Sequence, residues 1–127
     1  MHDCVLDASA LLALLNAEKG AEIAQDFLPD AVISAVNLAE VVSRLTAIGM
    51  PEMDIRDTLT LLGLEVIPFN EEQAYQAGLL YPFGREYGLS LGDRACLALA
   101  RSTAATAVTA DRAWVELNLG IEIKSIR

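Results

Sequence analysis

Residues 4–15 read Cys4-Val-Leu-Asp7-Ala-Ser9-Ala-Leu-Leu-Ala-Leu-Leu, and this stretch decides the fold of the 127-residue chain. Its first three residues are short and apolar, which predicts a strand over about residues 2–6. The alanines and leucines after Asp7 favour a helix that begins near Ala8 and runs to about Asn16. The chain therefore opens with a strand, an acidic residue at the strand's end and a helix.

The rest of the chain alternates helices with strands. Apolar residues at helical spacing mark several helices, which end before Pro29, Gly49 or Gly63. The expected helices are Glu18–Leu28, Val36–Ile48, Pro51–Leu62, Glu71–Leu80 and Gly92–Thr103, and the expected strands are Ala31–Ser34, Leu64–Phe69, Ala107–Thr109 and Gly120–Ile126. Residues 81–88 are expected to form a loop or a broken helix. Strands separated by helices, without a hairpin signal, predict an α/β fold with a parallel, helix-covered sheet.

The composition is that of a folded domain. With 54% hydrophobic and 21% charged residues the chain is not disordered, and residues 1–127 are expected to form a single domain. The longest aliphatic run, Ala10 to Leu15, is too short to span a bilayer. The N-terminus lacks the basic flank of a secretory signal. A soluble, cytoplasmic protein with no membrane partner is therefore expected.

The charge argues against nucleic acid as a partner, but not decisively. The net charge is −9, from 18 acidic and 9 basic residues, and a field of that sign repels nucleic acid. The basic residues are seven arginines and two lysines, and arginine suits planar contacts with carboxylate or phosphate. Anionic partners therefore stay open.

The cysteines disfavour several kinds of chemistry. Cys4 and Cys96 lie in apolar surroundings without CxxC spacing, and His2 is the only histidine. Buried, reduced thiols are the expected state. A zinc site, a cysteine nucleophile and a histidine-based triad are therefore disfavoured.

Four acidic residues stand where a parallel sheet gathers ligands, outside the carboxyl ends of its strands. Asp7 follows the first strand and Asp111 follows the strand at Ala107. Asp93 stands at the head of a helix, and Glu40 lies in the helix after the second strand, away from the apolar stripe of that helix. These positions predict that the four acids meet at one edge of the sheet.

Each acid also has a purely structural explanation. Asp7 could cap the first helix, and Ser90 with Asp93 fits a capping box. Asp111 could form a local hydrogen bond in a turn, and Glu40 could simply be solvated. Taken singly, these structural explanations are favoured.

The four acids together are harder to explain structurally. Three or four carboxylates at one edge repel each other unless a cation, protons or arginines compensate. Hard divalent cations such as Mg²⁺ or Mn²⁺ prefer an all-oxygen environment, and they activate water for displacement at phosphorus. Two such ions would offset four negative charges and leave −5 of the net −9. The charge objection is thereby partly answered.

Four segments of the chain resemble the PIN-domain family, and most closely its VapC-type toxins from bacterial toxin–antitoxin modules. They follow the expected order and are Val5-Leu-Asp7-Ala-Ser9, Asn37-Leu-Ala-Glu40, Leu89-Ser-Leu-Gly-Asp93-Arg-Ala-Cys and Val108-Thr-Ala-Asp111. The resemblance implies a three-layer fold with a parallel sheet of about five strands and helices on both faces. It also implies a metal-dependent endoribonuclease, a VapB-type antitoxin partner and a homodimer.

The resemblance also assigns residues. Asp7, Glu40, Asp93 and Asp111 match the family's acidic quartet and are the expected catalytic ligands of Mg²⁺ or Mn²⁺. Three neighbouring polar residues are expected to contact those carboxylates or their water; they are Ser9, Asn37 and Thr109.

Three arginines are candidates for binding RNA. Arg94 and Arg101 are seven residues apart on one helix, beside Asp93, and Arg112 adjoins Asp111. They could bind RNA phosphates or pair with acids, and both possibilities stay open. Core or dimer packing is favoured over base stacking for three aromatic residues, which are Tyr81, Phe83 and Tyr87.

Two other functions compete with the ribonuclease. A phosphotransferase of the haloacid-dehalogenase type would need a second Asp where Ser9 stands, and a catalytic lysine that neither Lys19 nor Lys124 supplies convincingly. A phosphorelay receiver would need an Asp where the third strand ends in Pro68-Phe-Asn. A non-catalytic relative that only binds a partner would not need all four acids. Metal-dependent RNA cleavage without phosphate release from small phosphoesters separates these functions.

Overall fold

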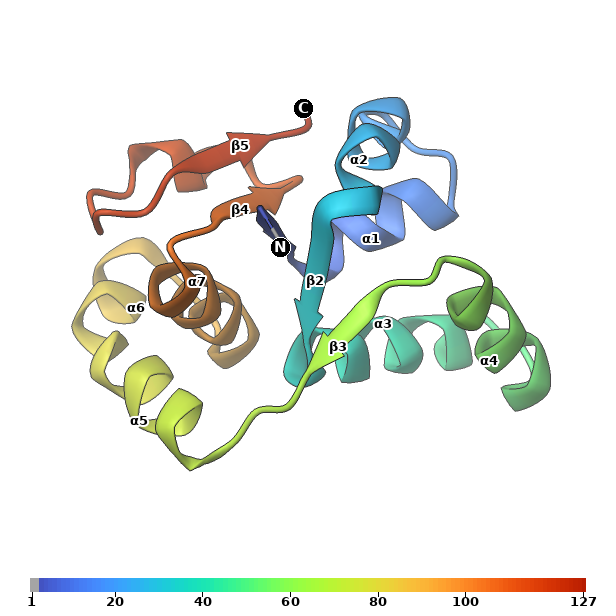
Figure 1. Ribbon diagram of the computed structural model, residues 1–127, viewed down its shortest axis with the longest axis horizontal. Coiled ribbons are helices and arrows are strands. Elements are labelled where there is room, and N and C mark those ends of the chain that lie inside the picture. The colour runs from blue at the N-terminus through green and yellow to red at the C-terminus, as the bar shows by residue number, and fades with distance from the viewer. Residues whose placement is uncertain (1–2) are drawn as a thin grey trace.

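The computed structural model describes residues 3–127, and its strands form one parallel sheet in the order β3-β2-β1-β4-β5 (Figure 1). The strands are β1 (Cys4–Leu6), β2 (Ala31–Ser34), β3 (Glu65–Ile67), β4 (Thr106–Thr109) and β5 (Ile123–Ser125). The predicted parallel α/β sheet is confirmed, with the five strands that the family resemblance implied.

Seven α-helices and two 3₁₀ segments connect the strands over the described residues. The helices are α1 (Ala8–Leu15), α2 (Ala21–Phe27), α3 (Ala35–Ala47), α4 (Glu52–Leu61), α5 (Glu71–Leu79), α6 (Tyr81–Tyr87) and α7 (Leu91–Thr103), and the 3₁₀ segments are η1 (Leu28–Asp30) and η2 (Arg112–Glu116). Residues 81–88 were expected to form a loop or a broken helix, but Tyr81–Tyr87 form a continuous helix, α6. Pro82 fits the first turn of α6, where a missing N–H costs nothing, and Gly88 ends the helix in a left-handed conformation.

Other boundaries differ from the expected ones for local reasons. The helix expected from residue 18 begins only at Ala21, because Gly20 adopts a φ of +95° at the helix N-cap. The strand expected over residues 120–126 pairs only over Ile123–Ser125, since only that part lies beside β4. The expected first strand includes residue 2, which lies outside the described residues. The segment η2 was not predicted.

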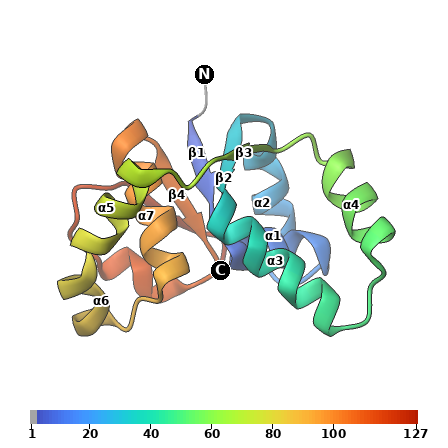
Figure 2. The same cartoon turned by 90° about the horizontal axis from the view of Figure 1, so that it is seen from below.

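The central strand β1 is buried on both faces. Val5 pairs with Val32 of β2 and with Ala107 of β4, and these three side chains pack against α5 and α7. Cys4 and Leu6 point the other way, into the core with α1 and α2. The sheet therefore lies between two helical layers, with α5–α7 on one side and α1–α2 on the other (Figure 2).

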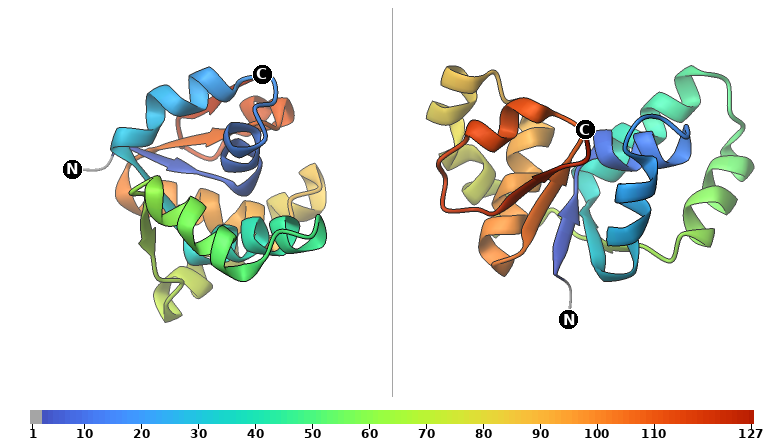
Figure 3. Two further views of the ribbon diagram at one scale, coloured as in Figure 1. Left: turned by 90° about the vertical axis from the view of Figure 1, so that its right-hand side faces the viewer. Right: turned by 90° about the horizontal axis from the view of Figure 1, so that it is seen from above.

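The carboxyl ends of the strands meet at one edge of the sheet, which Figure 3 shows from two sides. Asp7 follows β1 at this edge, and α3 begins there directly after β2. The helix α7 precedes β4 and runs antiparallel to it, so its first turn also lies at this edge. The topology thus brings the starts of α1, α3 and α7 together.

Two expectations about the chain as a whole can be compared with the structure. Cys4 and Cys96 are free and buried, as expected. Within residues 3–127, no helix has both the length and the apolar character needed to cross a bilayer.

Candidate active site

A pocket of about 490 Å³ opens where α1, α3 and α7 meet. We call it the acid pocket, and its polar lining residues are Asp7, Ser9, Asn37, Glu40, Ser43, Arg44 and Asp93. A larger hollow of about 890 Å³ lies between α3, α4 and β3, but its lining is mostly apolar and none of the four predicted acids belongs to it. The acid pocket is therefore the place to look for chemistry.

Asp7 is only 3% exposed and is held by three hydrogen-bond donors. The amide N–H of Ala10 donates to its Oδ1 at 2.8 Å, so Asp7 does cap α1. The hydroxyl of Ser9 donates to Oδ1 at 2.7 Å, and the hydroxyl of Thr109 donates to Oδ2 at 2.6 Å. The amide N–H of Ala110 in turn donates to Ser9 Oγ, which ties the end of β4 to the start of α1. The predicted contacts of Ser9 and Thr109 with the first acid are both present.

Burial raises the pKa of Asp7 to about 6, and the negative charge of Asp93 adds to this rise. The hydrogen bonds from Thr109, Ala10 and Ser9 act in the opposite direction, because they stabilise the ionised form. Three donors do not compensate for the loss of water around this carboxylate. A cation beside it would favour the charged form.

Glu40 accepts one hydrogen bond, from Asn37, and its carboxylate occupies the space left by the missing side chain of Gly92. The amide Nδ2 of Asn37 donates to Glu40 Oε1 at 3.2 Å and to the carbonyl oxygen of Gly92 at 3.1 Å, which joins α3 to α7. A Cβ atom at position 92 would overlap the Glu40 carboxylate, so only glycine leaves room for it. Burial raises the pKa of Glu40, and the charge of Asp93 raises it further.

Asp93 forms the predicted capping box with Ser90. The amide N–H of Ser90 donates to Asp93 Oδ2 at 2.9 Å, and the amide N–H of Asp93 donates to Ser90 Oγ at 3.1 Å. Asp93 nevertheless lines the acid pocket, and its charge acts on both Asp7 and Glu40. Capping and a place in the pocket are therefore compatible for this residue.

The charges of all three carboxylates affect the pKa of Cys96, a buried thiol on α7. The pKa of Cys96 is raised well above its usual value, first by burial and then by the charges of Asp7, Asp93 and Glu40. The three acids thus act on a single point beneath the pocket, as expected if they converge.

Asp111 is the one member of the predicted quartet that does not line the acid pocket. Its side chain is exposed, and Oδ1 accepts a hydrogen bond from the amide N–H of Ala113 at 3.0 Å, which caps η2. Its backbone N–H donates to Thr109 Oγ1, the same hydroxyl that donates to Asp7. Asp111 is therefore linked to the pocket through one threonine.

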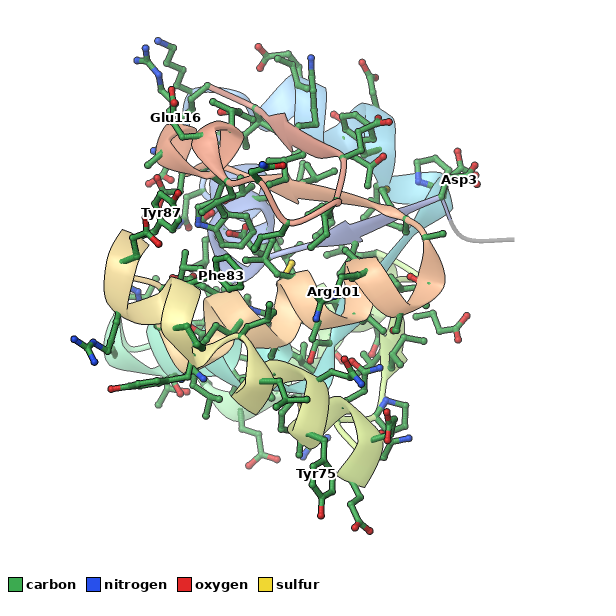
Figure 4. The ribbon with its side chains drawn as sticks, turned by 90° about the vertical axis from the view of Figure 1, so that its left-hand side faces the viewer. Asp3, Tyr75, Phe83, Tyr87, Arg101 and Glu116 are labelled. Carbon is green, nitrogen blue, oxygen red and sulfur yellow. The ribbon has the colours of Figure 1, made fainter. Side chains whose placement is uncertain are left out.

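The predicted RNA-binding arginines do not line the acid pocket. Arg94 turns the other way: it donates from Nη1 to the carbonyl oxygen of Ala77 at 3.1 Å and lies over the ring of Tyr81. It therefore braces α7 against α5 and α6. Arg101 lies on the outer surface of α7 (Figure 4), and Arg112 is exposed beside Asp111.

Two of the three predicted aromatic residues face solvent. Phe83 packs against the core, in agreement with the favoured interpretation. Tyr81 and Tyr87 are exposed, and neither lines the acid pocket.

The cation in the acid pocket is Arg44, which we did not predict as a functional residue. It lies one helical turn after Glu40 on α3, and its charge lowers the pKa of that acid. Its position on the same shoulder of the helix as Asn37 and Glu40 was the available signal. An acid and an arginine four residues apart usually indicate only a surface pair.

The residues of the acid pocket fit a hard divalent cation. They offer carboxylate oxygens, and Asn37 adds a buried Oδ1 that has no hydrogen-bond partner. Among residues 3–127, no three Asp, Glu, His or Cys side chains are arranged closely enough to hold a metal ion by themselves. Mg²⁺ commonly binds to one or two carboxylates and completes its shell with water, so this arrangement suits it.

Residues 4–118 match the PIN domain family, and the chain therefore belongs to that family. Its fold is similar to that of DNA-bound VapBC from Salmonella typhimurium, with a TM-score of 0.77, 20% identity and full coverage of both chains. A toxin–antitoxin complex from Klebsiella pneumoniae gives a TM-score of 0.74 at 19% identity, with 98% of each chain covered. VapBC2 from Rickettsia felis, bound to a promoter DNA fragment, gives 0.75 at 18% identity, with 96% of this chain and 97% of that chain covered. A comparison with curated protein sequences found no match.

Proposed function

We propose that this protein is a metal-dependent endoribonuclease and the toxin of a type II toxin–antitoxin module. The observation that carries the proposal is the acid pocket, where Asp7, Glu40 and Asp93 line one hollow at the carboxyl edge of a PIN-family sheet. The pKa values of Asp7 and Glu40 are raised, and carboxylates with raised pKa values in a hollow are typical of functional sites.

Asp7, Glu40 and Asp93 would hold Mg²⁺ or Mn²⁺ together with water molecules, and Asp111 is the fourth acid of the proposed quartet. When bound, the cation supplies an activated water and positive charge for an in-line displacement at phosphorus. The protein's own polar residues fix the carboxylates beforehand: Ser9 and Thr109 hold Asp7, and Asn37 holds Glu40. This preorganisation favours catalysis because the charges need not rearrange during the reaction.

The proposed partners follow from the similar structures. Those structures are of VapBC and other toxin–antitoxin complexes, which supports a VapB-type antitoxin as partner of this chain. A homodimer and a cytoplasmic location belong to the same proposal. Arg101 and Arg112 are exposed and remain candidates for RNA phosphate contacts, whereas the contacts of Arg94 with Ala77 and Tyr81 favour a structural role.

The pocket disfavours a phosphotransferase of the haloacid-dehalogenase type. Such an enzyme needs a second Asp where Ser9 stands, and the Ser9 hydroxyl donates a hydrogen bond to Asp7. No lysine lines the acid pocket in the described part of the chain. The raised pKa values of Asp7 and Glu40, together with their place in one pocket, favour a catalytic site over a binding module without catalytic activity.

The test is cleavage of a mixed-sequence RNA by the purified protein. Cleavage is expected with Mg²⁺ or Mn²⁺ and not in EDTA, and p-nitrophenyl phosphate should release neither p-nitrophenol nor inorganic phosphate under either condition. Expression of the chain should arrest growth, and co-expression of the antitoxin from the neighbouring reading frame should relieve the arrest. RNA that stays whole with both metals would overturn the ribonuclease, and phosphoester turnover would favour the phosphotransferase.

A further inference from the structure

A second hollow of about 340 Å³ adjoins the acid pocket where α1 packs against α3. We call it the arginine hollow, and its defining residues are Ser9, Leu12, Asn16, Glu18, Arg44 and Arg127. Ser9, Leu12 and Arg44 line both hollows. The two hollows are therefore adjacent, and Arg44 is one of the residues that they share.

The charged side chains of the two hollows differ, apart from Arg44, which lines both. The acid pocket has three carboxylates and one arginine, whereas the arginine hollow has two arginines and one carboxylate. Arg127 uses part of its guanidinium within the fold: Nε donates to the carbonyl oxygen of Lys19, and Nη2 pairs with Glu18 at 3.1 Å. A guanidinium has five N–H donors, so Arg127 keeps donors for a ligand.

Arg44 differs from the arginines that are bound within the fold. Arg56 pairs with Glu52 at 2.8 Å, and Arg94 donates to a carbonyl oxygen. Arg44 is exposed and donates no hydrogen bond to any residue of the described chain. Its guanidinium is thus free to bind a ligand that reaches the acid pocket.

We propose that Arg44 binds the RNA phosphate next to the scissile one, and that the strand continues through the arginine hollow toward Arg127. This inference rests on the proposed ribonuclease function. A chain of net charge −9 repels RNA, and the acids at the reaction site add to that repulsion. A cation at the exit of the acid pocket offsets it at the point where the backbone must enter, and arginine matches phosphate in shape.

The experiment measures binding of a mixed-sequence single-stranded oligoribonucleotide by fluorescence anisotropy, with Mg²⁺, in the Asp7→Asn background. Arg44→Gln should weaken binding about tenfold, the usual effect of losing a hydrogen bond to a charged group, and should lower the salt slope by about 0.7. Arg44→Lys should keep the slope, because it keeps the charge. Arg127→Gln should weaken binding less, since Glu18 already holds that residue. Arg56→Gln, a matched exposed arginine on α4, should bind as the parent does.

Three results would overturn the proposal. One is Arg44→Gln binding with unchanged affinity and slope. Another is an equal loss in Arg56→Gln, which would show only a general effect of charge. If Arg44→Gln instead lowers the thermal stabilisation by Mg²⁺ of the otherwise wild-type protein and leaves RNA binding alone, Arg44 acts on Glu40 and the proposal is wrong. Because binding is measured apart from cleavage, failure of the ribonuclease assay in wild type stays distinguishable.

Discussion

The acid pocket holds two of its carboxylates, Asp7 and Glu40, in opposite ways. Asp7 is buried, and three donors from α1 and β4 surround it. Glu40 is more exposed, has one amide donor from Asn37, and fits because position 92 has no side chain. Hydrogen-bond donors fix the Asp7 carboxylate, whereas the missing side chain at Gly92 makes room for the Glu40 carboxylate. Asp93 lines the same pocket, and its charge raises the pKa of both.

Among the predicted changes, removal of a carboxylate from the acid pocket should have the largest effect on RNA cleavage. Asp7→Ala and Asp93→Ala should each lower RNA cleavage on the order of a thousandfold, because a metal contact contributes several kcal/mol and each 1.4 kcal/mol is tenfold in rate. Ser90→Ala is the control for Asp93: it breaks the same capping box at a cost of about 1 kcal/mol but leaves the carboxylate. Normal cleavage by either alanine variant would refute its role.

A side chain at position 92 should disable the Glu40 side alone. Gly92→Ala displaces the Glu40 carboxylate, and a misplacement of about 1 Å at a reaction site can cost about a hundredfold in rate. The melting temperature should change by only a few degrees, because the end of a flexible side chain can move. Gly78→Ala is the matched control, since a Cβ there meets nothing within 4 Å. Equal cleavage by the two variants would contradict the role of the space.

The burial of Asp7 should make the free energy of unfolding depend on pH. Burial holds the pKa of Asp7 at about 6 in the folded protein, against 3.8 for the free side chain. Folding therefore favours the protonated form, so stability is full below pH 4 and falls as the pH rises through 6. The loss is about 3 kcal/mol in the absence of metal.

Urea unfolding in EDTA between pH 4 and pH 8 measures this effect. Asp7→Asn should flatten the decline and should be more stable than wild type above pH 7. The exposed Asp111→Asn should keep the decline. An equally steep decline in Asp7→Asn would assign the pH dependence to another group.

Stabilisation of the folded protein by metal should be the smallest of these effects, and it should require both Asp7 and Asp93. At ten times its dissociation constant, Mg²⁺ should stabilise wild type by about 1.4 kcal/mol, which is a rise of a few degrees in Tm. Asp7→Asn and Asp93→Asn should lose most of that gain, although asparagine caps a helix about as well as aspartate. If both variants gain as much as wild type, these residues are caps only.

The sequence was sufficient for the features that depend on neighbours along the chain. The strand before Asp7, the cap that Asp7 provides and the capping box of Ser90 with Asp93 are all local, and all are present. Convergence of Asp7, Glu40 and Asp93 followed from the parallel topology, in which strand ends share an edge. These are the parts of the site that the pattern could predict.

The remaining features depend on contacts between distant segments. The role of Gly92 depends on how closely α3 approaches α7. Arg94 adjoins Asp93, but successive helical residues point about 100° apart, and Arg94 faces Ala77 instead. The absence of Asp111 from the lining of the acid pocket depends on the course of the chain after β4, whereas its local bond with Ala113 was predicted. Residue spacing alone carries none of this information.

The two cysteines lie on opposite sides of the sheet. Cys4 is part of the core beneath α1 and α2, and Cys96 lies on α7 in the core of the other layer. A thiol reagent reaches each sulfur only when its own layer opens, because both are buried. The modification rate of Cys4 therefore reports how fast α1 and α2 separate from the sheet. The modification rate of Cys96 reports how fast α7, which lines the acid pocket, moves away from the sheet. The order in which the two sulfurs react gives the order in which the layers come apart.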